Sequence, residues 1–311
     1  MSAKDLHPRL TAMVERARVA GRAPVVALVY PCDGLALEVA AQMAAIGMAR
    51  PVLVGPRERI LRAGSAAEVD VSDFEMVATG DAASDAAQCA TTLARDGMVN
   101  ALMKGSLHTD ELMSAVVHRS TGLRGDTRIS HVFVFDLPRY HKLLALADCV
   151  VNIHPNLPTK RDILGNAIAL LQKIGIERPK VGIVSAVETV NPAIPATLDA
   201  QELVQMAREG AWPGAVVEGP FGFDNVISAE AARIKKMASQ VAGDADLLLV
   251  PDLNAGNMLY KSFNYIGGGD CAGLVLGAKV PIVLTSRADS LRSRIASVAL
   301  AVLAASNSAT H

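Results

Sequence analysis

The side chains best suited to chemistry are concentrated in residues 251–290, where two apolar runs each lead into a polar sequence. The first run is DLLLV at 246–250, and the second occupies residues 280–284. Apolar runs this short are typical of buried parallel strands. Ligands of open parallel sheets bind beyond the carboxyl ends of the strands, where helix amino termini offer N–H groups to anions. We therefore expect the residues after both runs to face one anionic ligand.

Ser286 and Arg287 follow the second run, at a predicted junction between that strand and a helix. A guanidinium presents a planar fork of donors and a hydroxyl adds one more, so the pair suits a phosphate or a developing oxyanion. Helix capping and ordinary surface charge are the structural alternative. Asp289 or Ser290 is expected to cap the helix, which continues to about residue 305.

Asn254, Asn257 and Lys261 follow the first run. Asn257 and Lys261 are four residues apart, so both point the same way from a helix that Asn254 is expected to cap. These side chains either line a ligand site or form a cap and a solvated helix face, and the pattern alone leaves both open.

A second polar cluster, KGSLHT at 104–109, follows a predicted strand at 101–104 and precedes a helix expected to begin near Asp110. A glycine permits close approach of the backbone, the helix start offers N–H groups, and a lysine supplies charge for a phosphate. For the histidine, helix capping or surface exposure is the alternative. The members of this cluster with a candidate binding role are Lys104, Gly105, Ser106, His108 and Thr109.

Helical and strand patterns alternate along the chain, which predicts an α/β fold with a mostly parallel sheet. Neither turn after the first two strands carries GxGxxG, so the dinucleotide fingerprint is missing. The glycine-rich, basic segment 118–128 has no apolar period and marks a domain boundary. Strands are expected at 25–30, 51–54, 74–78, 101–104, 129–135, 149–153, 180–186, 215–218, 246–250 and 280–284, and helices at 6–19, 35–48, 81–96, 159–174, 195–209 and 228–241.

Composition argues against several classes of function. The formal net charge of −1 over 311 residues makes nucleic acid a poor partner. The first ten residues are too polar for a signal peptide, and no apolar run approaches the roughly 18 to 20 residues that span a bilayer. The four cysteines are widely separated and show no metal-like spacing, so we expect reduced thiols, no metal and a cytoplasmic protein without membrane partners.

Several motifs occur in an order and spacing that resemble one enzyme family. Together they resemble the phosphate acetyltransferase and phosphate butyryltransferase family over nearly the whole chain, although each motif alone would be weak evidence. The motifs are RPVLVG (50–55), MKGSLHT (103–109), RISHVFVFDLP (128–138), ADCVVNIHPN (147–156), PDLNAGNMLYK (251–261) and TSRADS (285–290).

The resemblance implies a phosphate acyltransferase, which moves a short acyl group such as acetyl or butyryl reversibly between coenzyme A and inorganic phosphate. It implies two α/β/α domains with mostly parallel sheets and an interdomain active-site cleft, as in isocitrate/isopropylmalate dehydrogenase-like folds. The first domain would comprise residues 1–127 and 275–311, and the second residues 128–274. Coenzyme A and phosphate are then substrates, no cofactor is expected, and a homodimer is the expected assembly.

The resemblance also implies roles for individual residues. Ser286 and Arg287 coincide with the serine–arginine pair of the family's active site, and Asp289 is the nearest candidate for the base that takes the proton of the coenzyme A thiol. As an alternative, Asp289 is only the helix N-cap. The residues expected to bind substrate are Lys104, Gly105, Ser106, His108, Thr109, Arg128, Asn254, Asn257 and Lys261.

The chain departs from the acetyltransferase branch at two places. The helix after KGSLHT has LMSAV (112–116) where that branch carries an arginine. We expect Arg128 to replace it, and the alternative is that Arg128 is only a solvated loop charge. Residues 291–294 lack the carboxylate found further on in that branch. These departures favour the butyryltransferase-like branch, and they motivate one alternative, a catalytically impaired acyl-CoA-binding module. A dehydrogenase of the related fold would need a cluster of metal-binding aspartates, which the sequence lacks.

Overall fold

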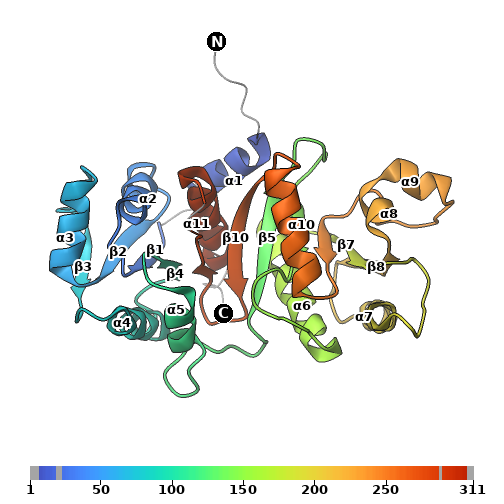
Figure 1. Ribbon diagram of the computed structural model, residues 1–311, viewed down its shortest axis with the longest axis horizontal. Helices are drawn as coiled ribbons and strands as arrows, with labels where there is room; N and C mark the ends of the chain where they lie inside the picture. The colour runs from blue at the N-terminus through green and yellow to red at the C-terminus, as the bar shows by residue number, and fades with distance from the viewer. Residues whose placement is uncertain (1–6, 19–22, 287–288, 307–311) are drawn as a thin grey trace, which may run out of the picture. The chain divides into compact units, whose positions relative to one another are not determined.

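The protein is described by a computed structural model that covers residues 7–18, 23–286 and 289–306 (Figure 1). Its contacts divide the chain into two compact units. The first unit consists of Leu10–Ile129 with Ala272–His311, and the second of Met1–Arg9 with Ser130–Cys271. The domain limits expected from the sequence fall a few residues away from these, and the assignment of domains stays a prediction.

The first unit is built on a mostly parallel sheet, in agreement with the alternating pattern of the sequence. Its strand order is β3-β2-β1-β4-β11-β10, in which β10 alone runs antiparallel to its neighbour β11. The central strands β1 and β4 are almost entirely buried and are apolar except for Lys104 at the end of β4, as expected for strands covered on both faces. The bounds are β1 Val25–Val29, β2 Arg50–Gly55, β3 Glu75–Ala78, β4 Ala101–Lys104, β10 Asp270–Leu276 and β11 Ile282–Val283.

Alanine-rich helices connect these strands, since small side chains let a helix lie close to a sheet. The helix α4 buries Ala86, Ala87, Ala90 and Ala94 in the core of this unit. Asp33 caps α2, where its carboxylate accepts a hydrogen bond of 2.8 Å from the Ala36 N–H. The helix α3 was not predicted from the sequence. The bounds are α1 Pro8–Arg18, α2 Gly34–Ala45, α3 Arg57–Ala66, α4 Ala83–Arg95, α5 Thr109–Val116 and α11 Leu291–Ser306.

The second unit has the strand order β5-β6-β9-β7-β8, in which β5 and β6 are antiparallel and the remaining neighbours parallel. Its apolar core includes Phe135, Leu146 and Leu248, each completely buried. The strands are β5 Ser130–Asp136, β6 Leu144–Ala147, β7 Lys180–Val184, β8 Val216–Phe221 and β9 Leu247–Leu249. The helices are α6 Leu157–Lys173, α7 Pro195–Arg208, α8 Phe223–Ile227, α9 Ala229–Ile234 and α10 Leu253–Tyr265.

The strand expected at residues 149–153 is wrong. The strand β6 ends at Ala147, and the residues after it form bends. The cause is Asp148, which is 3% exposed and whose carboxylate accepts hydrogen bonds from the N–H groups of Val150 (2.9 Å) and Val151 (3.0 Å). An aspartate that binds the backbone a few residues ahead folds the chain into a turn, even where the apolar sequence suggests a strand.

The single helix expected at 228–241 is also wrong, because α9 ends at Ile234. Lys236 has a φ of 53°, in the left-handed region that terminates a helix. The strand β10 was missed as well, since its glycine-rich approach at 267–269 resembles a loop rather than a strand. Within the ranges that the structure covers, no helix is long and apolar enough to cross a membrane.

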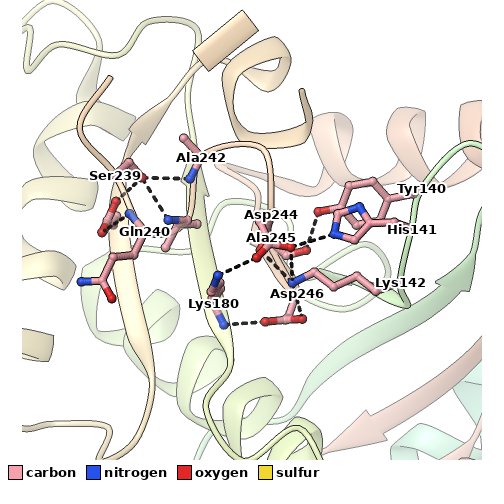
Figure 2. Close-up of polar contacts among 12 residues, drawn as sticks. Tyr140, His141, Lys142, Lys180, Ser239, Gln240, Ala242, Asp244, Ala245 and Asp246 are labelled. Atoms are coloured by element: carbon pink, nitrogen blue, oxygen red, sulfur yellow. Dashed lines mark hydrogen bonds and ion pairs between the residues drawn. The ribbon is translucent and has the colours of Figure 1, made fainter. Parts of the chain in front are cut away.

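A network of ion pairs ties together β7, the loop before β9 and the loop after β5 in the second unit. Figure 2 shows Asp244 between Lys180 and the pair His141 and Lys142. Its carboxylate oxygens lie 2.5 Å from the Lys180 Nζ and 2.9 Å from the Lys142 Nζ. Burial acts to raise the pKa of Asp244, but the hydrogen bonds from Lys180, Lys142 and His141 outweigh it and hold the pKa well below its ordinary value.

We expect Asp244→Asn to lower the free energy of unfolding by about 1 kcal/mol at pH 7, a modest loss because the side chain is 39% exposed. A depressed carboxyl pKa stabilises the fold above the unfolded pKa of about 3.9 and loses that contribution as pH falls toward the folded pKa. Urea unfolding at pH 7 and at about pH 3.5 should therefore show a smaller difference from wild type in acid. Glu202→Gln, at an exposed site on α7, is the control. A pH-independent difference would contradict the ion-pair account.

Candidate functional site

The carboxyl ends of three neighbouring strands in the first unit bring several of the predicted site residues of this unit, among them Lys104 and Ser286, to one edge of the sheet. The strand β4 lies between β1 and β11 and is parallel to both, so residues 30–32, 104–106 and 285–286 all leave the sheet at the same edge. The Thr285 hydroxyl joins two of these segments, since it donates a hydrogen bond of 3.2 Å to the Lys104 carbonyl.

Lys104 is the last residue of β4 and is only 9% exposed. Its Nζ donates hydrogen bonds to the carbonyl oxygens of Gly105 (3.2 Å) and Leu107 (3.1 Å), which hold the ammonium group over the turn that follows. Lys104 thus places an ammonium group at the carboxyl end of a parallel strand, the edge at which such sheets bind their ligands. This geometry suits the phosphate-binding role predicted for Lys104.

Gly105 lies against the backbone of β1. A Cβ at this position would sit 2.6 Å from the carbonyl oxygens of both Val29 and Tyr30, so only glycine fits. Ser106 stabilises this contact between the ends of β1 and β4, because its hydroxyl donates to the Tyr30 carbonyl (2.8 Å) and accepts from the Cys32 N–H (3.2 Å). Both residues, predicted to bind substrate, thus also hold the strand ends together.

Tyr30 was not predicted as a site residue, yet it is the centre of this contact. Its φ of 55° places a bulky side chain in the left-handed region, a strained conformation that recurs at functional sites. Its hydroxyl donates to the Asp81 carbonyl (3.1 Å) and contacts the Arg59 guanidinium. Burial raises the pKa of this tyrosine, which therefore stays protonated at neutral pH.

His108 and Thr109 lie at the start of α5 and are exposed. His108 occupies the N-cap position, where its backbone N–H donates to the Glu111 carboxylate at 2.8 Å. The first turn of α5 also carries the carboxylates of Asp110 and Glu111, which themselves interact favourably with the positive end of the helix dipole. The phosphate-binding role expected for this helix start stays a prediction.

Ser286 and Asp289, which lie between β11 and α11, hydrogen-bond to each other, and this bonded pair is called the turn below. The Ser286 N–H donates to the Asp289 carboxylate at 2.7 Å, and the Asp289 N–H donates to the Ser286 carbonyl at 3.2 Å. The helix cap is Ser290, whose hydroxyl accepts from the Ser293 N–H at 3.1 Å. Ser286 is exposed. Arg287 lies outside the described residues.

Arg294 also contacts this turn and was missed by the sequence analysis. It is 5% exposed and donates hydrogen bonds to three oxygens of the segment 285–289. One signal in the sequence could have indicated it. A cation near the amino end of a helix interacts unfavourably with the helix dipole, so an arginine four residues after the cap is unusual and suggests a specific role.

The residues predicted at the start of α10 belong to the second unit. Asp252, and not Asn254, caps this helix, since its carboxylate accepts from the Ala255 N–H at 3.0 Å. Asn254 and Lys261 are exposed. Asn257 is half-buried and its amide lies 3.5 Å from the Cys149 carbonyl, in the turn that Asp148 forms.

A buried histidine lies beside the same turn. His131 is 1% exposed, and its backbone N–H donates to the Asp148 carboxylate at 3.2 Å. Burial lowers the pKa of His131 to about 4, although Asp148 acts in the opposite direction. The imidazole is therefore neutral at pH 7. Within the described ranges its Nδ1 has no hydrogen-bond partner.

Arg128, expected to replace a missing arginine, is exposed at the end of the loop before β5. Among the residues that the structure covers, no three histidine, cysteine or acidic side chains come together in a way that would hold a metal ion. The described cysteines are all free thiols, with Cys149 and Cys271 buried and Cys32 and Cys89 half-buried.

Comparisons with known proteins place the chain in a family. The family model described as "Phosphate acetyl/butaryl transferase" matches residues 73–302, which include both the KGSLHT and the TSRADS segments. The chain belongs to this phosphate acetyl/butyryl transferase family. Membership confirms the resemblance carried by the sequence motifs.

Three relatives illustrate this transferase family. The chain is 50% identical over 282 residues to the phosphate acetyltransferase of Rhizobium meliloti, covering 90% of this chain and 89% of that protein. It is 39% identical to the phosphate butyryltransferase of Clostridium acetobutylicum, covering 84% and 86%. The crystal structure of a branched-chain phosphotransacylase from Enterococcus faecalis V583 superposes with a TM-score of 0.80 at 29% identity, covering 91% and 99%.

Proposed function

We propose that the protein is a phosphate acyltransferase, which converts acyl-CoA and inorganic phosphate reversibly into acyl phosphate and coenzyme A. The observation that carries this proposal is the close match to transferases named for that reaction, 50% identical to one of them over most of both chains. The geometry of the first unit supports it, because Lys104 ends β4, Ser286 follows the adjacent parallel strand β11, and Arg294 of α11 donates to the Thr285 hydroxyl beside them. Such an edge is suited to a phosphate and to a developing oxyanion.

The proposed reaction is direct transfer between two bound substrates. A phosphate oxygen attacks the thioester carbonyl carbon and the C–S bond breaks. The products are acyl phosphate and the thiolate of coenzyme A, which takes up a proton to become the free thiol. Donors aimed at the carbonyl oxygen stabilise the charge that develops there, and positioning supplies much of the remaining acceleration. Ser286 and Arg287 are proposed as those donors, and Lys104 and Arg128 as ligands of phosphate.

Asp289 is proposed as the group that exchanges the thiol proton, although its carboxylate also accepts the Ser286 N–H. A base must come within hydrogen-bond reach of the proton that it moves. Rotation of the Asp289 side chain away from Ser286 would provide that reach, at the cost of opening the turn. If Asp289 serves only the turn, Asp289→Asn will retain most of the wild-type activity.

The acyl chain remains the finer part of the proposal. The higher identity to a protein named acetyltransferase favours acetyl-CoA, whereas the missing arginine at 112–116 favours a longer chain. One or two methylenes change binding by only about 1 to 3 kcal/mol, so one pocket can accept several chains. Substrate binding by Asn254, Asn257 and Lys261, the isocitrate/isopropylmalate dehydrogenase-like fold, the cytoplasmic location and the homodimer also stay predictions.

The proposal is tested by the release of free thiol from acetyl-CoA, propionyl-CoA and butyryl-CoA, each with and without phosphate. We expect release that depends on phosphate, and the ranking of kcat/KM among the three thioesters assigns the acyl chain. Sulfate at equal ionic strength is the control for a non-specific salt effect. A folded protein that binds coenzyme A but releases no thiol would instead be the catalytically impaired binding module.

A further inference from the structure

We propose that Arg294 is a positioning residue for this acyl transfer, which holds the turn that presents Ser286 and contributes positive charge beside it. The inference rests on the proposed function and adds a residue that neither the sequence motifs nor the family resemblance assigns. It is carried by contacts within the first unit.

The Arg294 guanidinium donates hydrogen bonds to three oxygen atoms at the turn. Its Nη2 donates to the Ser286 carbonyl at 2.7 Å, its Nη1 to the Thr285 hydroxyl at 3.3 Å, and its Nε to the Asp289 carbonyl at 3.3 Å. The planar guanidinium offers these donors in fixed directions, so it selects one conformation of the turn. Loss of the side chain would leave the carbonyls without a partner on that side and free the turn to move.

The charge of Arg294 is not neutralised by these contacts. All three acceptors are neutral oxygens, two of them backbone carbonyls and one a hydroxyl. At 5% exposure a guanidinium is also largely shielded from water, and buried cations are normally paired with an anion. The position near the amino end of α11 adds the positive end of the helix dipole. Together these features favour an anionic substrate group at the turn.

The contacts of Arg294 also extend to the neighbouring strand. The Thr285 hydroxyl that accepts from Arg294 donates to the Lys104 carbonyl at 3.2 Å. A polar chain therefore runs from the guanidinium through Thr285 to the end of β4, where the Lys104 ammonium is held. Through this chain Arg294 fixes the spacing between Ser286 and Lys104.

A purely structural anchor for α11 would make the same contacts, so the test needs a readout that stability alone does not move. Arg294→Met removes the charge and the donors, whereas Arg294→Lys keeps the charge and loses the planar fork. Arg292→Met is the matched control, because Arg292 is an exposed arginine on the same helix, whose Nη2 donates to the Thr11 hydroxyl at 2.9 Å. Melting temperatures establish that each variant is folded.

We expect Arg294→Met to reduce kcat/KM for phosphate by about 10²-fold, the loss typical of a misplaced reacting group. Arg294→Lys should keep the KM for phosphate near the wild-type value while kcat falls, since charge survives and geometry does not. Added guanidinium ion at millimolar concentration should restore part of the activity of Arg294→Ala and leave Arg292→Ala unchanged. Arg292→Met should behave as wild type.

Folded Arg294→Met and Arg294→Lys variants with wild-type kcat and KM would overturn the inference while the proposed function stands. Equal losses in the two variants that follow their melting temperatures, without rescue by guanidinium, would assign Arg294 to stability alone and also overturn it. A wild-type protein without phosphate-dependent thiol release would overturn the proposed function, and the inference with it.

Discussion

Replacing Ser286 by alanine should lower kcat for phosphate-dependent thiol release by about 10²- to 10³-fold, the usual loss when one oxyanion donor is removed. The reason is that Ser286 is an exposed residue whose backbone N–H and carbonyl are bound by Asp289 and Arg294. The substitution removes one oxygen and leaves those backbone contacts in place. We therefore expect an unchanged melting temperature and a loss confined to activity, measured by steady-state kinetics at saturating acyl-CoA.

Ser65→Ala, at an exposed position on α3, is the matched control for the Ser286 variant. It removes the same atom from a helix surface away from the turn and should retain wild-type kinetics. A Ser286→Ala enzyme with a kcat within twofold of wild type would contradict the role assigned to this hydroxyl. It would indicate that backbone N–H groups stabilise the oxyanion instead.

Gly105→Ala is expected to give the largest loss of stability, about 3 kcal/mol in the free energy of unfolding, at the upper end of overpacking effects. The added Cβ would lie 2.6 Å from the carbonyl oxygens of Val29 in β1 and of Tyr30 just after it, and 2.8 Å from the Tyr30 carbonyl carbon. All three are backbone atoms at the end of β1, where hydrogen bonds from the Gly105 and Ser106 N–H groups hold the two carbonyls, so they have little freedom to move aside. Separation of β1 from β4 would also displace Lys104, and activity should fall more than the folded fraction does.

Gly97→Ala provides the contrast for this measurement. Gly97 has a φ of 76° and no atom within 4 Å of an added Cβ, so the substitution costs only the left-handed backbone conformation, about 1 to 2 kcal/mol. Denaturant unfolding of both variants separates the two causes. A Gly105→Ala protein no less stable than Gly97→Ala would contradict the close approach of the two strands.

Much of the fold follows from local pattern. The strand β4 has the limits expected from the sequence, and α7 ends within one residue of its prediction, because apolar runs and helical periodicity are strong local signals. The mostly parallel sheet follows from the alternation of helices and strands. The order β1-β4-β11 does not, since it pairs residues far apart in the sequence, and this order is what places Ser286 near Lys104.

The errors occur where one side chain overrides the local pattern. Asp148 turns the apolar sequence after Ala147 away from a strand, and Asp252 takes the cap expected of Asn254. Arg294 was missed because its role depends on burial against a turn that folds back on it, which spacing alone does not indicate. Tyr30 was missed for a similar reason, since its left-handed φ is not encoded by its residue type.

The most direct test of the central claim is the stoichiometry of products from acetyl-CoA and phosphate. Free thiol and acetyl phosphate, the latter trapped as the hydroxamate, should appear in equal amounts and only when phosphate is present. Thiol released without acetyl phosphate would indicate hydrolysis of the thioester and would contradict transfer to phosphate.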